Sequence, residues 1–483
     1  MQLLLPAIFL LLFIFLIRML NFFSSDGLSK SQFIGLFLIK CFAGACVWFV
    51  YTYYYPGSDL HLYFDSSHDL MHHLFSGTSG EISAWNGNFE DAFYLNSRLV
   101  IVTNVFLHLI SFNNIFVHIL FFCFFSFVGL TALYKAMYSH FPAKNYALVI
   151  GIFLVPSVLF WTSGIYKETL VVLFLGLIVY HTDFGLRKNY SVSQIVLTIL
   201  SFLALVFTKI HVAAALVPVL LVNVLYSRAE KKRLWLSFIM IFVPMILLMY
   251  SISLVSDRLS VFKLIADRQA KAISEAKGGA FLLNKSNFIC VDYYDEDALI
   301  LQPDSTYRLN PGTSYLSWKP DNMRDTTFIS GATDTSSFLL LYKVMPANTI
   351  VNLNHVRPDF LSVLKNTPAA IGNALLQPTL FHSHNLLQMF AAIENLWLLL
   401  LIVLTLIFFD IKLNGKKEVL LFCLLFAIFQ LIMIGLTTPA IGAIVRYKST
   451  ALLMLAPLCL SCLDLSKISR VLFPGKNRDS GTK

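Results

Sequence analysis

The sequence is poor in charged residues. Asp, Glu, Lys and Arg make up 13% of its 483 residues, whereas a soluble globular protein averages about 25%. In their place, 57% of the residues are hydrophobic and the mean hydropathy is +0.72. This composition excludes intrinsic disorder, a nucleic-acid-binding domain and an ordinary cytosolic enzyme, so no nucleic acid is expected as a partner. It predicts a polytopic membrane protein.

Several short motifs of well-known enzyme classes are also missing. The sequence has no P-loop, no G-x-G-x-x-G, no G-x-S-x-G and no H-E-x-x-H, which disfavours an ATP-driven pump or a membrane metalloprotease of those types. Of the seven cysteines, only Cys290 lies in a large polar segment. That segment therefore cannot hold an internal disulfide.

Long runs of apolar residues make up most of the sequence. A membrane helix needs about 20 mostly apolar residues, and this criterion predicts about eleven of them in an all-α polytopic integral membrane protein. The predicted helices cover residues 2–22, 33–55, 114–134, 145–161, 169–182, 193–208, 211–226, 234–256, 391–409, 419–436 and 449–463. Two hydrophilic stretches interrupt them. The resulting units are 1–55 (two helices), 56–113 (first external loop), 114–256 (helices three to eight), 257–390 (external insertion), 391–463 (helices nine to eleven) and 464–483 (cytoplasmic tail).

The positions of Lys and Arg predict the orientation. With the N-terminus outside and the C-terminus in the cytoplasm, the cytoplasmic segments hold 17 basic and 7 acidic residues, and the external side has a net charge of −3. An excess of basic residues is typical of cytoplasmic loops. We therefore expect a multi-pass protein of the cytoplasmic (inner) membrane.

The two hydrophilic stretches are predicted to be structured. Residues 92–113 are apolar, but Arg98, Asn104 and His108 recur along them, which favours an amphipathic helix lying in the outer interface over a poorly hydrophobic spanning helix. Residues 257–390 begin with amphipathic helical sequence, continue with short strand-like pieces and end with a helical stretch at 358–377. They predict a small mixed extracytoplasmic insertion.

Polar residues directly after the second helix form the first candidate site. Pro56-Gly57 predicts a turn that presents Asp59 and His61, Asp65 follows, and His68 to His73 are expected on a short helix. A carboxylate beside an imidazole can act as a general base or hold a divalent metal. The alternative is a solvated polar loop.

Three further clusters place cations at external helix ends, against the overall charge bias. Lys167-Glu168 lies between two short apolar runs, and a lysine there can pair with a phosphate or diphosphate. The alternative for Lys167-Glu168 is the polar tip of a helical hairpin, and the alternative for Arg446 to Lys448 is simple anchoring at the membrane interface. The predicted phosphate-binding residues, all on one side of the membrane, are Lys167, Glu168, Lys209, His211, Arg446, Tyr447 and Lys448.

Two more charged residues are weaker candidates. Arg357, in the external insertion, can reach the same site, and Glu394, at the start of the ninth helix, is expected to pair with a basic residue. No set of metal ligands is evident, so the metal remains unknown.

The layout of the chain resembles the GT-C superfamily of multi-spanning glycosyltransferases. The resemblance rests on Asp59 opening the first external loop, an amphipathic helix in that loop, many irregular helices and a sizeable external insertion. It implies a sugar donor linked to polyprenyl phosphate or polyprenyl diphosphate. It also implies that Asp59 acts as catalytic base or metal ligand, with Asp65 as the nearest acidic partner. A divalent Mg or Mn ion is the one cofactor that it implies.

Two stretches are also similar to bacterial surface-polysaccharide polymerases, which join lipid-linked repeat units outside the cytoplasmic membrane. These are PSVLFWTSGIYKE (156–168) and GAIVRYK (442–448). In this version Lys167, Lys209 and Arg446 hold diphosphate groups and no metal is needed.

The combined prediction is a membrane glycosyltransferase of GT-C type that acts on the external face, in the assembly of cell-surface polysaccharide or glycolipid. Its expected partners are membrane lipid, the polyprenyl-linked donor, a glycan or lipid acceptor and other glycan-assembly proteins. A repeat-unit polymerase is the closest alternative. A lipid-linked glycan flippase is the non-enzymatic one, although transporters commonly contain two related halves and no internal repeat is visible.

Overall fold

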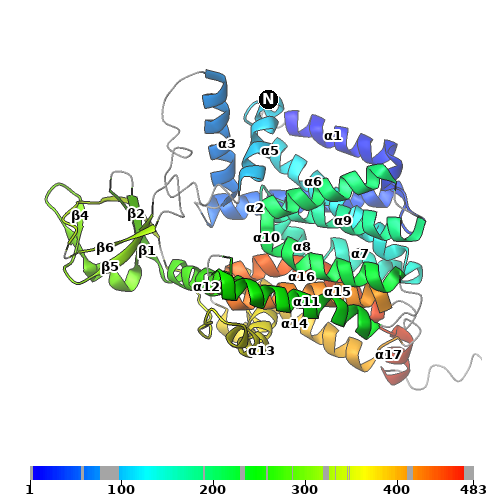
Figure 1. The fold of residues 1–483 in the computed structure, drawn as a ribbon. Helices are drawn as coiled ribbons and strands as arrows, with labels where there is room; N and C mark the ends of the chain where they lie inside the picture. Colours follow the sequence, from blue (N-terminus) through cyan, green and yellow to red (C-terminus); the bar gives the residue numbers. More distant parts are fainter. Residues whose placement is uncertain are drawn as a thin grey trace, which may run out of the picture.

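The computed structural model describes residues 4–472 except 56–58, 77–96, 189–190, 229–233, 257–258, 285–286, 319–325, 332, 345, 348, 384 and 411–416. Long helices form a bundle, and a small unit of β-strands projects from one end of it (Figure 1). We call the end that bears the strands, where α11 leads into α12, the sheet end. The other end, where α9 and α17 terminate, is the opposite end.

Helices account for most of the chain. Their bounds are α1 Leu4–Met19, α2 Lys30–Tyr53, α3 Asp59–Ser76, α5 Arg98–Ser111, α6 Ile115–Tyr138, α7 Asn145–Phe153, α8 Pro156–Trp161, α9 Lys167–Lys188, α10 Val192–Arg228, α11 Leu234–Val255, α12 Val261–Lys277, α13 Phe360–Leu376, α14 Leu386–Ile407, α15 Lys417–Thr437, α16 Ile441–Cys462 and α17 Leu465–Leu472.

Eight helices in the described part of the chain are long and apolar enough to cross a membrane. They are α2, α6, α9, α10, α11, α14, α15 and α16. This supports the predicted multi-pass membrane protein, but the predicted number of eleven is not confirmed. The difference arises because α1 has only 16 residues, residues 145–161 are divided between α7 and α8, and the expected pair 193–208 and 211–226 forms one bent helix.

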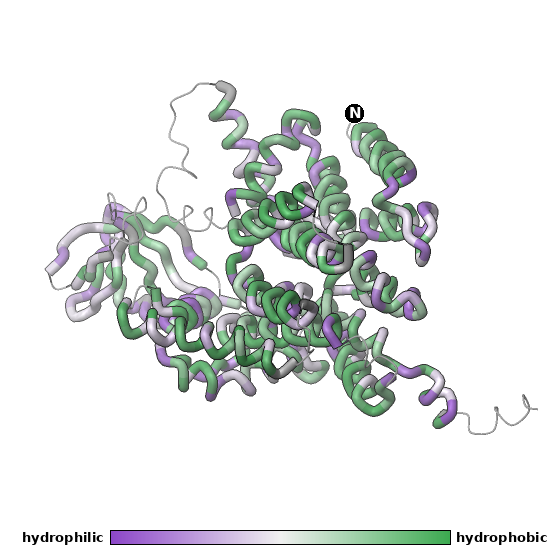
Figure 2. Tube along the Cα trace, turned by 45° about the vertical axis from the view of Figure 1, so that its right-hand side comes forward, coloured by the Kyte–Doolittle hydropathy of each residue, from purple (hydrophilic) through white to green (hydrophobic). Residues whose placement is uncertain are grey.

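The outer surface of the bundle is apolar, as contact with lipid requires. Phe42 is 72% exposed, Leu248 61% and Leu406 76%. Soluble monomers rarely expose large contiguous apolar patches. Figure 2 shows hydrophobic residues along most of the helices, with hydrophilic residues concentrated near helix ends and connections.

Helix α10 bends at Lys209, where φ is −150° and ψ is 89°. Its 37 residues would span about 55 Å as a straight helix at 1.5 Å per residue, well beyond the roughly 30 Å of a bilayer core. The bend gives two arms of ordinary spanning length. It also places Lys209 at the sheet end, where the sequence predicts a break between two helices.

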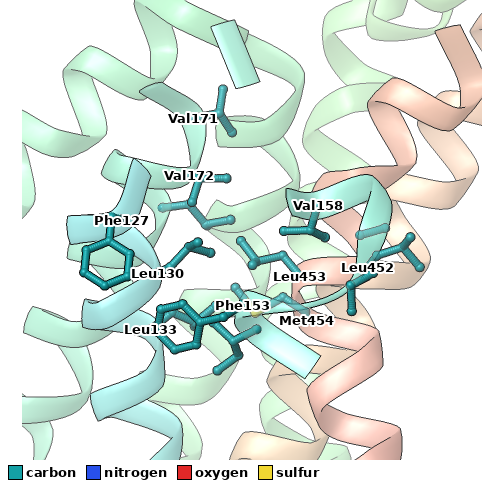
Figure 3. Packing of buried hydrophobic residues seen from close by; sticks show 14 of the residues in the cluster. Phe127, Leu130, Leu133, Phe153, Val158, Val171, Val172, Leu452, Leu453 and Met454 are labelled. Atoms are coloured by element: carbon teal, nitrogen blue, oxygen red, sulfur yellow. The ribbon is translucent and has the colours of Figure 1, made fainter. Parts of the chain in front are cut away.

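The bundle core forms where small residues let helices approach closely. A Cβ atom on Gly176 of α9 would lie 2.0 Å from the carbonyl oxygen of Gly129 on α6, so neither position accommodates a side chain without movement. Around this contact, Phe127 and Leu130 of α6 and Val172 of α9 belong to the large buried cluster (Figure 3). This packing fixes α9, which carries part of the candidate site.

The strand unit follows α12. Gly278 ends that helix with φ at +88°, a conformation that glycine adopts without strain. Five antiparallel strands then form a sheet in the order β6-β5-β2-β1-β7, and β3 pairs with β4. The strands are β1 Gly279–Asn284, β2 Asn287–Asp292, β3 Leu299–Leu301, β4 Tyr307–Leu309, β5 Ser314–Trp318, β6 Thr326–Ser330 and β7 Leu339–Val344.

Two local predictions need correction. Helix α3 already begins at Asp59, so Asp59 and His61 lie in its first turn and not in a loop before a short helix. Helix α16 begins at Ile441, eight residues earlier than predicted, so Arg446 to Lys448 lie within it. Buried polar partners, described below, make charged residues tolerable inside this helix. Of the predicted interfacial helix 92–113, α5 covers Arg98–Ser111, and residues 92–96 lie outside the described residues.

Candidate functional site

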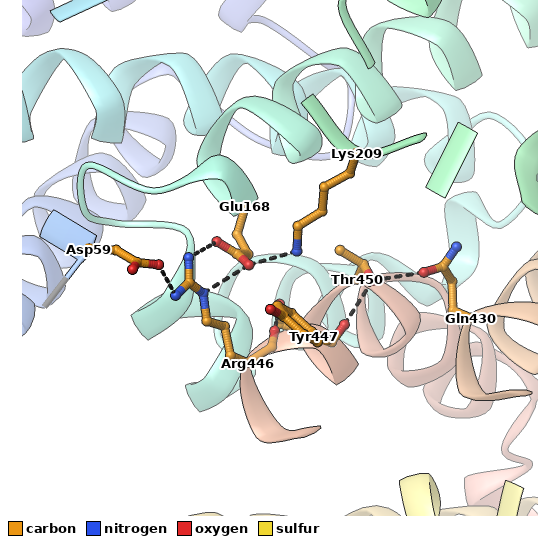
Figure 4. Close-up of polar contacts among 8 residues, drawn as sticks. Asp59, Glu168, Lys209, Gln430, Arg446, Tyr447 and Thr450 are labelled. Atoms are coloured by element: carbon orange, nitrogen blue, oxygen red, sulfur yellow. Dashed lines mark hydrogen bonds and ion pairs between the residues drawn. The ribbon is translucent and has the colours of Figure 1, made fainter. Parts of the chain in front are cut away.

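A buried network of ion pairs lies at the sheet end of the bundle (Figure 4). The carboxylate of Glu168 accepts a hydrogen bond from Lys209 Nζ at 2.7 Å and from Arg446 Nη2 at 2.9 Å. Arg446 Nη1 donates to Asp59 Oδ2 at 2.5 Å. We call Asp59, Lys167, Glu168, Lys209 and Arg446 the charged cluster.

The members of the charged cluster differ in their access to the surroundings. The side chain of Glu168 is fully buried, that of Lys209 is 7% exposed and that of Arg446 is 16% exposed. Asp59 is 30% exposed and forms the rim. Lys167 lies within Coulombic reach of Asp59, Glu168, Lys209 and Arg446. Asp59 is therefore more exposed than the two cations that Glu168 binds.

Four helices far apart in the sequence supply these side chains. Glu168 lies in the first turn of α9, Lys209 at the bend of α10, Arg446 in the second turn of α16 and Asp59 in the first turn of α3. Each side chain lies near a helix terminus or a break, where the backbone can turn a side chain inward. With all five groups ionised, three cations face two carboxylates, and the cluster has a net charge of +1.

Aromatic rings surround the cations. The guanidinium carbon of Arg446 lies 4.8 Å from the ring centre of Tyr166 and 5.7 Å from that of Trp161. Lys209 Nζ lies 4.3 Å from the ring centre of Tyr447. Cations over aromatic faces are stabilised by about 0.5–2 kcal/mol. The side chains of Lys209 and Glu168 are almost fully buried, so their charges interact more strongly than they would in solution.

The turn between α8 and α9, which leads to Lys167 and Glu168, is held by buried hydrogen bonds. Lys40 of α2 is 1% exposed and donates to Thr162 Oγ1 at 2.7 Å and to Ser163 Oγ at 3.2 Å. Ser126 Oγ of α6 donates to the carbonyl oxygen of Thr162 at 2.7 Å. Burying a lysine that has only hydroxyl groups as partners costs free energy. We therefore interpret Lys40 as a residue that fixes the conformation of this turn.

Lys448 and Glu394 belong to a second polar group on another side of α16. Lys448 Nζ donates to Asn395 Oδ1 at 2.7 Å and to the carbonyl oxygen of Gln377 at 2.9 Å. Glu394 accepts from the backbone N–H and the hydroxyl of Ser157, at 2.8 and 2.6 Å. Residues two apart on a helix point about 200° apart, so Lys448 does not share the neighbours of Arg446.

The remaining predicted residues have other neighbours. His61 Nε2 lies 3.0 Å from Thr52 Oγ1. Asp65 is exposed, and its nearest charged neighbours are His61, His68 and Asp69; desolvation raises its pKa from the ordinary value. His211 follows the bend in α10, within Coulombic reach of Lys209 and Glu168. The structure thus brings Asp59 to the charged cluster but leaves Asp65 outside it.

Arg357, the last of the predicted residues, is exposed in the segment before α13. Its backbone N–H donates to Ser362 Oγ at 2.9 Å. Within the described residues its side chain forms no ion pair.

Sequence reasoning missed several residues that the structure adds to the site. In the sequence, Lys40 is notable only as a charged residue within an apolar run. Charged residues inside membrane helices often mark functional sites, and this rule would have identified Lys40 as a candidate. Trp161 and Tyr166 lie in the motif that contains Lys167, but nothing in their spacing shows that they enclose Arg446. Their role depends on tertiary packing.

A divalent cation does not fit the charged cluster well. Mg²⁺ and Mn²⁺ favour oxygen ligands, and the only carboxylates here, Asp59 and Glu168, both accept hydrogen bonds from Arg446. The net charge of +1 also favours an anion. Across the described ranges, no three His, Cys, Asp or Glu side chains form a group suited to a metal.

Comparison of this chain with protein-family models, with curated proteins and with solved structures finds no match. The functional argument therefore depends on the geometry of the site and on its chemistry.

Proposed function

We propose that this chain is a membrane glycosyltransferase of GT-C type. Its donor is a sugar linked to polyprenyl phosphate or diphosphate, and its active site is at the sheet end, on the external side of the cytoplasmic membrane. In the sequence, the basic segments with a net charge of +10 precede or follow the helix ends that lie at the opposite end, and the positive-inside rule assigns that end to the cytoplasm. The N-terminus is then outside and the C-terminus inside.

The observation that supports this function best is the charged cluster. It places three cations and an accessible carboxylate at the end of an apolar bundle, with a net positive charge. Such a site suits a ligand that combines a phosphate with a long apolar chain, because the phosphate can pair with the cations while the chain remains in lipid. Arg446 offers the planar fork that binds phosphate oxygens, and Lys167 and Lys209 act as point charges.

Glycosyl transfer needs two kinds of group, and the cluster supplies both. As the bond from the anomeric carbon to the phosphate oxygen breaks, negative charge builds up on the leaving phosphate, and the cations stabilise it. A base must take the proton of the acceptor hydroxyl. Asp59 is the carboxylate at the rim, so it is positioned to receive that proton. This mechanism uses no metal ion.

The experiment that tests this proposal uses purified full-length protein in nanodiscs with lipid-linked glycans extracted from native membranes. Asp59→Asn should lower product formation at least about a hundredfold, the usual contribution of a general base, while donor binding survives. Asp69→Asn, on the exposed side of the same helix, is the matched control and should leave turnover unchanged. Full activity of Asp59→Asn would refute the assignment of the base.

A second candidate, a repeat-unit polymerase, is favoured by one contact. The two stretches that resemble surface-polysaccharide polymerases meet directly, because Glu168 of the first binds Arg446 of the second. Mass spectrometry of lipid-linked glycans from a deletion strain separates the candidates. A missing sugar favours a transferase, whereas complete single repeat units with no polymer favour a polymerase.

A further inference from the structure

Four histidine rings form a row through the contact of α3 with α5 and α6, outside the charged cluster. The row runs from the exposed His72 of α3 through His68 to His108 of α5 and His118 of α6. Successive ring centres along it are 4.5, 5.4 and 4.4 Å apart. His108 is 4% exposed and His118 is fully buried. The mechanism proposed above uses none of these groups, so their burial needs another explanation.

The hydrogen bonds of His108 show which of its ring nitrogens carries the proton. Ser67 Oγ donates to the carbonyl oxygen of Phe64 at 2.7 Å, so its single proton is not available to His108. His108 Nε2 lies 2.9 Å from Ser67 Oγ and 3.3 Å from the same carbonyl oxygen, which can only accept. Nε2 therefore carries the proton and donates it. Nδ1 then holds a lone pair, buried without a hydrogen-bond partner among the described residues.

His118 offers no acceptor for a second proton on His108. The side-chain nitrogen of Asn104 donates to the carbonyl oxygen of Val100 at 2.8 Å, so Asn104 Oδ1 is the acceptor. His118 Nδ1 lies 2.7 Å from that oxygen and must donate to it. His118 Nε2 then accepts from Ser111 Oγ at 2.8 Å. Both ring nitrogens of His118 are occupied, and its ring is neutral.

A proton added to His108 Nδ1 would be poorly accommodated. The ionisable groups around the ring are His68 and His72 on α3 and His118 on α6; α10, which also packs on α5, adds none among the described residues. No carboxylate is among these groups. The ring of Phe64 packs against His108 and His118, with ring centres 4.8 and 4.9 Å away. Burial lowers the pKa of His108 to about 4, so the ring is uncharged at neutral pH.

We propose that neutral His108 is a latch that holds α3 against α5 and α6 and opens in acid. While the ring is neutral, the hydrogen bond from Nε2 and the packing of Phe64 hold α3 in place. Protonation creates a buried charge without an acceptor, and that charge is better solvated once α3 has moved away. Because Asp59 lies in the first turn of α3, release of the helix also withdraws Asp59 from Arg446. The latch does not depend on the proposed glycosyl transfer.

The direction and the size of the pH dependence follow from the pKa of His108 in the two states. In the released helix the ring recovers the ordinary pKa of 6.5, whereas docking lowers the pKa to about 4. Docking is therefore unaffected above about pH 6.5, weakens as the pH falls below that value, and weakens no further below about pH 4. Between pH 7.5 and pH 5 the equilibrium constant for docking should fall about thirtyfold.

Hydrogen exchange of the full-length protein in nanodiscs tests the latch. Peptides from α3 are compared at pH 7.5 and pH 5 after correction for intrinsic exchange rates, and α12, which contains no histidine, is the internal reference. The protection of α3 should fall about thirtyfold, and that of α12 should not change. His108→Gln keeps a donor near the position of Nε2 but does not titrate, so its α3 should stay protected at pH 5. His72→Gln, the matched control, removes an exposed histidine and should show the full loss.

Two results would overturn the inference. One is an α3 helix that is as well protected at pH 5 as at pH 7.5 in the unchanged protein. The other is an equal loss in His108→Gln, which would assign the effect to another group on α3, such as Asp59. If His108→Gln does not fold, Ser67→Ala takes its place, because it removes one of the two acceptors of His108 Nε2. Its α3 should exchange about fivefold faster at pH 7.5, and an unchanged rate would also refute the latch.

Discussion

Replacement of Glu168 by Gln tests whether the charged cluster is held together by charge. The substitution keeps the size and shape of the side chain and removes its negative charge. In the native protein the fully buried carboxylate binds both Lys209 and Arg446. After the change, Arg446 still forms its ion pair with Asp59, but Lys209 loses the only carboxylate with which it forms an ion pair among the described residues. Removing one member of a buried ion pair typically costs about 3–5 kcal/mol, so we expect the free energy of unfolding to fall by about that amount.

A double-mutant cycle separates this pairing from a general packing defect. Lys209→Met removes the cation that Glu168→Gln leaves unpaired and keeps a similar volume. The double variant should therefore be more stable than the sum of the two single changes predicts, with a coupling free energy of about 1.5–3 kcal/mol. The free energies are measured by reversible unfolding of the purified protein in mixed micelles with increasing amounts of denaturing detergent.

An exposed ion pair provides the control for this cycle. Glu275 is 50% exposed and lies 3.8 Å from Lys271, so Glu275→Gln should change stability by less than about 0.5 kcal/mol. The reasoning would be refuted by a Glu168→Gln protein as stable as the Glu275→Gln protein, or by a coupling free energy near zero. Either result would mean that solvent or lipid headgroups neutralise Lys209 and Arg446.

Three further predictions follow from other parts of the structure. Lys40→Met should leave the stability of the protein unchanged or raise it, because the substitution removes a buried charge. It should also lower the proposed glycosyl transfer, because the turn at Thr162 loses the hydrogen bond that holds it. Both effects are checked by measuring unfolding and turnover on the same preparation. Gly176→Ala should destabilise the protein by about 1–3 kcal/mol, because the new methyl group overpacks against α6. Gly35→Ala has open space around the new Cβ and should stabilise the protein by up to about 1 kcal/mol. Equal unfolding midpoints of the two variants would contradict this prediction. Burial raises the pKa of the Cys290 thiol to about 11, so alkylation of a variant with Cys290 as its only cysteine should quicken about tenfold per pH unit between pH 8 and 10, since the thiolate is the nucleophile.

The sequence predicted most of the charged cluster, and the reason is physical. Lys167, Glu168 and Lys209 interrupt apolar runs, and a charge in such a position is costly unless something binds it. A break at Lys209 was also predicted, as the gap between helices 193–208 and 211–226, but the structure has one bent helix there in place of two. The identity of the partners was not predictable, since Asp59 and Arg446 are 387 residues apart.

The errors arise from helix starts and helix faces. Because α16 was predicted to begin at 449, Arg446 and Lys448 were placed together at one helix end. Within the observed helix they point in different directions, and Lys448 binds Asn395. In the same way, Asp65 follows Asp59 closely in sequence but lies six positions along α3. Six residues turn an α-helix by about 240°, which directs Asp65 away from Arg446.

In the proposed mechanism, the pairing of Asp59 with Arg446 links donor binding to the release of the base. In the structure the Asp59 carboxylate accepts a hydrogen bond from Arg446. A donor phosphate would compete for the same guanidinium, because arginine pairs with phosphate oxygens as it does with carboxylates. Asp59 would then lose its hydrogen-bond partner at the rim and become free to accept the hydrogen bond of an acceptor hydroxyl. Anion binding at this site would therefore be an exchange of partners, and the fully buried Glu168 would keep Arg446 and Lys209 in position while the exchange occurs.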